Sequence, residues 1–98
     1  MGLTITWTSR AKFDYHNILQ YLQRNWTKKE LQKFIDKTAK TISIIADKPE
    51  LFPATKRRNS RRCVLSKQTS LYYRVKKKEI ELLMFWDNRQ NPKTLKFP

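Results

Sequence analysis

The spacing of apolar residues changes once along this chain, and that change limits the folds open to it. Between Ser9 and Asp47 apolar side chains recur every three or four residues, which is the spacing of one face of a helix. From Arg62 to Trp86 they alternate with polar residues, as in strands whose successive side chains point to opposite faces. A chain that is helical first and extended afterwards is expected to form an α+β domain, with helices packed on one face of a sheet.

The first half of the chain predicts a short strand followed by two helices. Residues 3–7 alternate between apolar and polar side chains, and Thr8 or Ser9 then offers an oxygen that can cap a helix. Further on, Thr27 and Glu30 have the spacing of a capping box, in which each satisfies a free backbone donor at the start of the second helix.

Apolar residues at helical spacing mark the buried faces of both predicted helices. They are Ala11, Tyr15, Ile18, Leu19, Leu22 and Trp26 in the first helix and Leu31, Phe34, Ile35, Thr38, Ile42 and Ile45 in the second. Pro49 ends the second helix because the residue before a proline is disfavoured in helical geometry. Since about two residues separate the two helices, they should form an antiparallel hairpin.

Three strands are expected after the helices. Residues 62–67, 71–76 and 80–86 alternate and are joined by short links, so neighbouring strands should be antiparallel. The last of them is apolar enough to lie in the centre of the sheet. The predicted order is β-α-α-β-β-β in a single domain over residues 1–98, with the helical hairpin on one face of a mainly antiparallel sheet.

The loop at residues 49–60 combines two different compositions. Near its start, Leu51, Phe52 and Pro53 are expected to anchor the loop to the core. Its second half continues into a run of five cations within seven positions: Lys56, Arg57, Arg58, Arg61 and Arg62. Such a run is most often a solvated loop, and it is equally suited to bind phosphate or the carboxylates of a partner.

Strand alternation also predicts the two faces of the sheet. Toward the helices we expect Cys63, Leu65, Leu71, Tyr73, Val75, Ile80, Leu82 and Met84, and on the opposite face Arg62, Val64, Tyr72, Arg74, Glu81, Leu83, Phe85 and Asp87. The second set mixes cations with aromatic rings, which suits phosphate contact and base stacking. Arginine and tyrosine are also ordinary in cross-strand pairs, so Arg74 could simply pair with Glu81 or Asp87.

Positive charge is the strongest indication of function. The chain has 22 Lys and Arg against 8 Asp and Glu, a net charge of +14, and residues 51–98 carry 13 of the basic and 3 of the acidic side chains. A fold does not require this excess. It is typical of proteins that bind nucleic acid, a ribosome, an anionic membrane or an acidic partner protein.

Scarce residue types exclude other classes. A single cysteine, Cys63, and a single histidine, His16, exclude zinc fingers and disulfide scaffolds, so we expect neither a metal nor a small-molecule cofactor. The lone thiol fits a reducing cytoplasm. No apolar run approaches the ~18 residues of a membrane span, which leads us to expect a cytoplasmic protein without a membrane partner.

Four features together resemble the RelE/ParE toxins of bacterial type II toxin–antitoxin systems, above all the variants called plasmid stabilisation proteins. They are the predicted element order, the link from Asp47-Lys48-Pro49 to Phe52-Pro53, the strand Leu71-Tyr72-Tyr73-Arg74-Val75, and the sequence FWDNRQNP at positions 85–92. The resemblance rests on their order and spacing over nearly the whole chain. It implies a cognate acidic antitoxin and one of two targets: mRNA on the ribosome, which is cleaved, or DNA gyrase, which is inhibited without cleavage.

For the nuclease branch the resemblance also implies site residues. Metal-free RNA cleavage needs a base, an acid, and cations that stabilise the charge on phosphorus. In RelE-like nucleases these cations lie on the three C-terminal strands. Arg62 matches the first of these positions and Arg89 the arginine after the last strand, whereas Ser70 falls nearest the remaining one and Arg74 lies four residues later.

The acid or base of that branch has no clear counterpart in this chain. Neither Tyr nor His follows Arg89, and His16 on the first helix is a poor substitute. Asp87 or Tyr72 could serve only if its pKa were shifted. Arg89 could instead pair with Asp87 and tie the tail to the sheet.

Three hypotheses therefore stay open. The first is an endoribonuclease with Arg62, Arg74 and Arg89 as phosphate clamps, and the second is a gyrase inhibitor that works by protein contact. The third is a catalytically inactive family member that only binds its antitoxin or nucleic acid.

Overall fold

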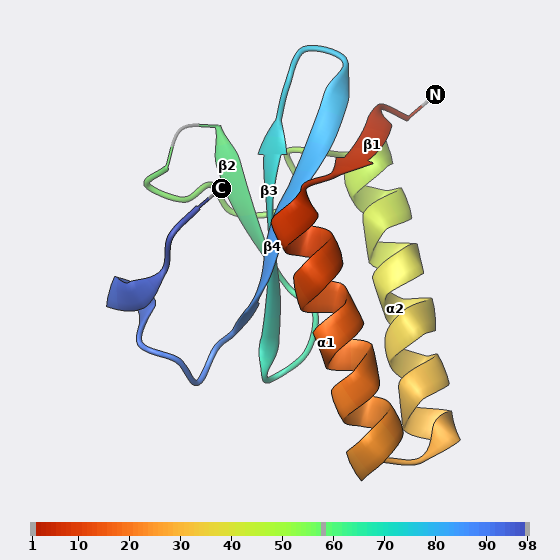
Figure 1. The fold of residues 1–98 in the computed structure, drawn as a ribbon. Coiled ribbons are helices and arrows are strands. Elements are labelled where there is room, and N and C mark those ends of the chain that lie inside the picture. Colours follow the sequence, from red (N-terminus) through yellow and green to blue (C-terminus); the bar gives the residue numbers. More distant parts are fainter. Residues whose placement is uncertain (1, 58, 98) are drawn as a thin grey trace.

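Two helices cover one face of a four-stranded sheet, and the C-terminal segment crosses the other face (Figure 1). This computed structural model describes residues 2–57 and 59–97. Its elements are β1 (Thr4–Trp7), α1 (Ser9–Asn25), α2 (Lys28–Asp47), β2 (Ser60–Val64), β3 (Thr69–Val75), β4 (Glu79–Asp87) and a short 3₁₀ helix, η1 (Pro92–Thr94). The predicted element order and the α+β class are confirmed.

The strand order in the sheet is β1-β4-β3-β2, so β4 lies inside the sheet, as its apolar sequence predicts. The pairs β2–β3 and β3–β4 are antiparallel, whereas β1 runs parallel to β4 at an edge. The predicted strand bounds were wrong for β2 and for the start of β3, which begins at Thr69 rather than at residue 71. β2 spans Ser60–Val64 rather than residues 62–67, because Ser60 and Arg61 already pair with Arg74 and Tyr73 of β3.

Both helices start with a threonine cap at the positions that the sequence predicts. The Thr8 hydroxyl oxygen accepts from the Ala11 amide at 3.0 Å, and that of Thr27 accepts from the Glu30 amide at 3.2 Å. One residue departs from the expected apolar face. Trp26 follows the end of α1 in extended backbone and is 55% exposed, so it does not join the helix's buried side.

The main core lies between the helical hairpin and the sheet. Its buried members are Ala11, Ile45, Cys63, Leu65, Leu71, Tyr73, Ile80, Leu82 and Phe85. Trp7 and Tyr15 pack beside Phe85, with ring centroids 5.2–5.8 Å from it or from each other. Of the core residues expected from the helices, Phe34 and Ile42 are half-buried at the edge of this cluster.

A β-bulge changes the predicted faces of the last strand. Tyr72 pairs with Met84 and Tyr73 with Leu82, which leaves Leu83 as an extra residue in β4. Because one extra residue reverses the alternation after it, Phe85 faces the helices and Met84 faces away, opposite to the expectation from strict alternation.

The face away from the helices is also buried over β3 and β4, although Val64 on β2 is 54% exposed. Tyr72, Leu83, Met84 and Trp86 form a second cluster there, and all are 8% exposed or less. The C-terminal tail covers them with the half-buried side chains of Leu95 and Phe97, and Figure 1 shows the tail on the side of the sheet opposite the helices. The molecule therefore has two apolar layers, one on each side of the sheet.

The loop before β2 is anchored mainly through its backbone. Phe52 packs on the main core as expected, but Leu51 is 58% exposed and Pro53 is also exposed, so neither of these two is an anchor. Arg61 holds the loop by donating to the carbonyl oxygens of Phe52 at 2.7 Å and Glu50 at 3.2 Å.

Candidate functional site

Arg62 lies on β2 with its side chain on the face away from the helices. Its Nε donates to the Ser70 hydroxyl at 3.1 Å, and its terminal nitrogen donates to the Asn88 side-chain oxygen at 3.2 Å. Ser70 is fully buried and itself donates to Asn88 at 2.7 Å. Two side chains from β3 and the end of β4 thus fix the direction of one exposed guanidinium.

Arg89 is engaged by the carboxylate that the sequence suggested as its partner. Its Nε and terminal nitrogen donate to both oxygens of Asp87 at 2.7–3.2 Å, and its backbone amide donates to the same carboxylate at 2.9 Å. The side-chain hydrogen bonds from Arg89 are the main reason why the pKa of Asp87 is lowered. Asp87 is therefore an ionised carboxylate whose oxygens are already occupied.

Arg74 pairs with Glu81, one of the two partners that cross-strand pairing predicts. Its guanidinium lies 3.6 Å from the Glu81 carboxylate, which also contacts the Lys76 ammonium at 3.4 Å. Arg74 and Glu81 are directly opposite each other in the β3–β4 ladder. The pair belongs to the end of the sheet near the β3–β4 turn.

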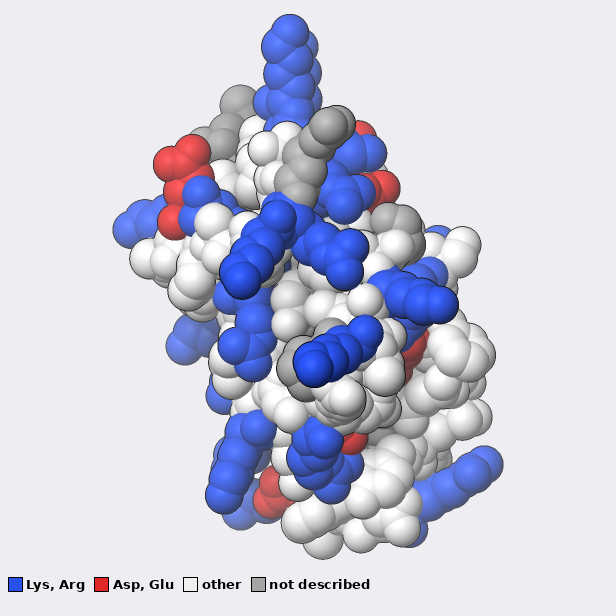
Figure 2. Space-filling model, turned by 90° about the vertical axis from the view of Figure 1, so that its left-hand side faces the viewer, with Lys and Arg blue, Asp and Glu red and all other residues white. Residues whose placement is uncertain are grey.

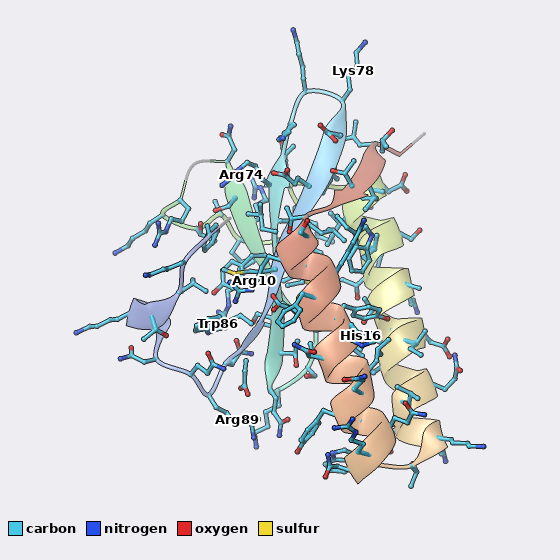
Figure 3. The ribbon with its side chains drawn as sticks, in the orientation of Figure 1. Arg10, His16, Arg74, Lys78, Trp86 and Arg89 are labelled. Atoms are coloured by element: carbon cyan, nitrogen blue, oxygen red, sulfur yellow. The ribbon has the colours of Figure 1, made fainter. Side chains whose placement is uncertain are left out.

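The three arginines do not gather around a common point. Asp87, the partner of Arg89, lies opposite Thr69 in the β3–β4 register. Arg74 is five positions further along β3, or about 17 Å at a strand's usual rise. Figure 3 shows Arg74 and Arg89 toward opposite ends of the sheet. Arg62 reaches toward Ser70 and Asn88, so its guanidinium lies in the half of the sheet that contains Arg89.

Tyr72 and His16, the other titratable candidates, lie in different layers. Tyr72 is 8% exposed, and its ring meets Phe97 edge-on at 5.1 Å between centroids. His16 is exposed on α1, and Figure 3 shows it on the helical layer. His16 is therefore on the wrong side of the sheet to act with Arg62.

A groove of about 620 Å³ runs between the basic loop and the tail. Lys56, Arg57, Arg62 and Tyr72 are among its lining residues, so two of the expected phosphate-binding cations and two of the site candidates meet here. Figure 2 views this side and shows blue Lys and Arg side chains around a pale centre. Arg61 is instead turned to the loop backbone, and Arg58 lies outside the described residues.

Within residues 2–57 and 59–97, no three His, Cys, Asp or Glu side chains stand close enough to hold a metal ion. In the same described ranges, neither helix has the length and apolar character that a bilayer span demands.

Comparison with known proteins gives matches by structure. No protein-family model and no curated protein matches the chain. The chromosomal ParDE TA system from P. aeruginosa is 18% identical with a TM-score of 0.72, over 87% of this chain and 95% of that one. The YoeB/ParE toxin from Agrobacterium tumefaciens is 12% identical, with a TM-score of 0.63 and coverages of 88% and 99%. The YoeB dimer from Staphylococcus aureus is 18% identical, with a TM-score of 0.62 and coverages of 88% and 97%.

The chain has the RelE/ParE toxin fold. Within that fold, the position nearest the expected third-strand arginine is occupied by the buried Ser70, and Arg62 from the neighbouring strand reaches to it. Asp87 belongs to the helix side of the sheet because of the bulge in β4, contrary to the expectation that it shares a face with Arg62 and Tyr72.

Sequence reasoning missed a second groove in this chain. It also measures about 620 Å³ and lies between the end of the helical hairpin where α1 joins α2, the β2–β3 turn and the end of β4. Tyr21 and Trp26, 53% and 55% exposed, line it together with Lys33, Lys37 and Arg89. The signal that could have found it is the pair of aromatic residues at the hairpin end, where the chain has little core left to fill.

Proposed function

We propose that this chain is the toxin of a bacterial type II toxin–antitoxin pair, held inactive by a small acidic antitoxin encoded beside it. The observation that carries the proposal is the RelE/ParE fold combined with a net charge of +14. Charge of this size favours fast association with an acidic protein, and that association slows as salt screens the charges. Two of the similar structures are described as a ParDE TA system and a YoeB/ParE toxin, which supports the same role.

For the target, we infer inhibition of DNA gyrase by protein contact rather than RNA cleavage. Arg89, which matches the arginine expected after the last strand, is bound through its guanidinium and its amide to Asp87. Arg74 is paired with Glu81 at the other end of the sheet. A transition state on one phosphate needs its cations preorganised around one point, and this arrangement favours dispersed contact instead.

A ribosome-dependent endoribonuclease is the second candidate, and one observation favours it. The Arg62 guanidinium is oriented by Ser70 and Asn88 in the groove that Lys56 and Arg57 also line. A planar guanidinium fixed by two of its donors can present the others to a phosphate as a pair.

Growth arrest on induction separates these candidates. We would induce the parent chain and the variants Arg62→Lys, Arg74→Lys and Arg89→Lys in bacteria, and follow translation, mRNA integrity and DNA breaks in parallel. Arg24→Lys, at the end of α1, is the matched control because it makes the same change on the helical layer. Each variant's melting temperature is checked first.

The expected result is DNA damage before any loss of translation, with arrest within about twofold of the parent in all three variants, since lysine keeps the positive charge. Prompt translation arrest with cut mRNA, abolished by Arg62→Lys, would establish the endoribonuclease instead. No arrest in the parent would leave the inactive, antitoxin-binding alternative. Restored growth on co-expression of the neighbouring acidic protein tests the partner independently of the target.

A further inference from the structure

The second groove, at the end of the helical hairpin where α1 joins α2, has the size of a small-molecule site. Its volume of about 620 Å³ lies within the range of about 300–1,000 Å³ that such sites occupy. Figure 1 shows the α1–α2 junction and the β2–β3 turn, which both contribute to its walls, at the same end of the molecule. The buried and half-buried apolar side chains that line it are Ile18, Leu22, Phe34, Phe85 and Trp86. A ligand with a flat apolar part can therefore bury that part here.

Exposed aromatic rings line the groove beside these apolar residues. Among the described residues, the aromatic side chains that are more than half exposed are Phe13, Tyr21 and Trp26, and the last two belong to this groove. Tyr21 lies near the end of α1 and Trp26 follows that helix in extended backbone, so both rings come from the same end of the hairpin. Flat rings of this kind offer a stacking surface to a nucleobase, whatever its identity.

Cations reach the groove from three separate elements. Lys33 and Lys37 lie one turn apart in α2, with their Cα atoms about 6 Å apart at the helical rise, and Lys67 lies in the β2–β3 turn. Within the described part of the chain, none of these three lysines is in an ion pair. Arg89, which Figure 3 shows at this end of the sheet, is held by Asp87 through its Nε and one terminal nitrogen, so the other terminal nitrogen is left for an anion. Cations spread in this way suit a chain of phosphates better than one compact anion.

The carboxylates of the groove narrow the ligand class further. Asp14 and Asp87 are each paired with an arginine, at 2.9 Å and 2.7 Å. Glu30, in the first turn of α2, is half-buried and is in no ion pair within the described ranges. A carboxylate of this kind repels the acidic side chains of a peptide, whereas it can accept hydrogen bonds from the hydroxyls of a ribose. The lining therefore favours a ligand that carries hydroxyls as well as phosphates.

We propose that this groove binds a nucleoside triphosphate, with the base against the two exposed rings and the phosphates among the lysines. The ribose hydroxyls donate to Glu30. Binding of a single strand of nucleic acid needs further rings along its path, and the remaining exposed ring, that of Phe13, lies outside the groove. One base in one site thus fits the lining better. The inference goes beyond the proposed function and does not depend on it.

Isothermal titration calorimetry of the full chain tests the proposal, in buffer without divalent cations. The probes are ATP, GTP, adenosine and inorganic tripolyphosphate, so that base and phosphates are offered together and separately. We expect ATP and GTP to bind alike, since stacking tolerates either base, and about tenfold or more tightly than adenosine or tripolyphosphate. Tripolyphosphate that binds as tightly as ATP would overturn the proposal, because attraction by net charge alone would then explain the binding.

A matched pair of aromatic variants tests the place of the base. Trp26→Ala should weaken ATP binding about tenfold, whereas Phe13→Ala, which removes a similarly exposed ring outside the groove, should leave it within about twofold of the parent. Equal losses in the two variants would overturn this site. Hexathymidylate is titrated in parallel. If it bound more tightly than ATP and lost that affinity in Trp26→Ala, the groove would belong to single-stranded nucleic acid and the nucleotide would be ruled out.

A matched pair of lysine variants tests the place of the phosphates. Lys33→Gln with Lys37→Gln should weaken ATP binding about tenfold at low salt, and less at high salt as the charges are screened. Lys28→Gln with Lys40→Gln removes the same charge from exposed positions of the same helix outside the groove. The control should stay within about threefold of the parent, since distant exposed charges are largely screened. Equal losses in the two double variants would overturn the phosphate positions.

Folding of every variant is checked by thermal melting. If Trp26→Ala melts without a cooperative transition, Tyr21→Ala replaces it, because Tyr21 is also exposed and alanine favours the helix. Unchanged ATP binding in that variant would overturn the proposal. None of these titrations involves growth arrest or an antitoxin. Absence of nucleotide binding would therefore leave the toxin proposal intact, and absence of growth arrest would leave the nucleotide site intact.

Discussion

On one face of the sheet, helices of 17 and 20 residues enclose the main core, and on the other a tail of about ten residues covers a second cluster. The helical layer is joined to the sheet by polar contacts as well as packing. Asp14 of α1 accepts from the Phe85 amide at 3.2 Å, and the Thr8 hydroxyl donates to the Leu83 carbonyl at 2.8 Å. On the tail side, Asn88 accepts from Ser70 and Arg62 at the start of the tail, and the covering residues Leu95 and Phe97 are contacted by the exposed Arg57.

The difference shows that burial and rigidity are separate properties. Leu82 and Leu83 are adjacent in β4 and both are fully buried, yet they belong to clusters on opposite sides of the sheet. When a side chain beneath two capped helices is truncated, the cavity stays open because the helices cannot move in to fill it. A cavity beneath a tail can be refilled by movement of the tail, because little else holds it.

The largest expected effect tests this difference directly. Leu82→Ala should lower the free energy of unfolding by about 4–5 kcal/mol, and Leu83→Ala by about 2–3 kcal/mol, since the cost rises with the volume of the cavity that remains. Both losses are to be measured by urea denaturation followed by circular dichroism. Equal losses at the two positions would mean that the tail is as rigid as the helices and would contradict the comparison.

The helical layer could be predicted from the sequence because each of its signals is local. Thr8 and Thr27 cap helices whose apolar spacing is regular, and Pro49 follows the end of α2. The bulge at Leu83 could not be predicted in this way, since alternation looks intact on either side of it and the pairing with β3 decides which residue is extra. The tail's position depends likewise on a contact between Phe97 and Tyr72, far apart in sequence.

The sequence predicted which residues belong to the candidate site better than it predicted how those residues are arranged. Two of the predicted ion pairs, Arg89 with Asp87 and Arg74 with Glu81, follow from short separation or strand register. The link from Arg62 to Ser70 and Asn88 joins three segments of the chain, so no local pattern contains it. The exposed Trp26 shows the converse, because helical spacing continues past the residue at which the helix ends.

A smaller effect distinguishes the two faces by pH. Tyr73, on the helix side, is fully buried and donates to the Pro49 carbonyl at 2.7 Å, and burial raises its pKa to about 12. Below pH 10 the phenol is protonated in both states. Between pH 10 and 12 the unfolded chain loses this proton first, so the protein should lose about 2–3 kcal/mol of stability as the pH rises through that window.

Tyr73→Phe should remove the part of the stability loss above pH 10 that comes from this phenol. The free energy of unfolding is measured by urea denaturation at pH 9 and at pH about 11.5. Tyr72→Phe, one residue away on the tail side, is the matched control. If the parent and Tyr73→Phe lost the same stability over this pH range, the Tyr73 phenol would titrate alike in the folded and unfolded states. The evidence that the helix-covered face is the more tightly closed would then be removed.

The smallest expected effect concerns how the helical layer is tied to the sheet. The Thr8 hydroxyl does two things at once: it accepts from the Ala11 amide and donates to the Leu83 carbonyl. Thr27 caps α2 through the Glu30 amide at an exposed position.

Thr8→Ala should therefore lower the free energy of unfolding by about 2 kcal/mol, because it removes the cap and leaves the Leu83 carbonyl without its partner. Thr27→Ala should lower it by about 0.5–1 kcal/mol, because it removes the cap alone. Thr8→Ser restores the hydroxyl and should recover most of the loss. If the two alanine variants were equally stable in urea, the hydrogen bond from Thr8 to the Leu83 carbonyl would contribute nothing to the stability of the helical layer.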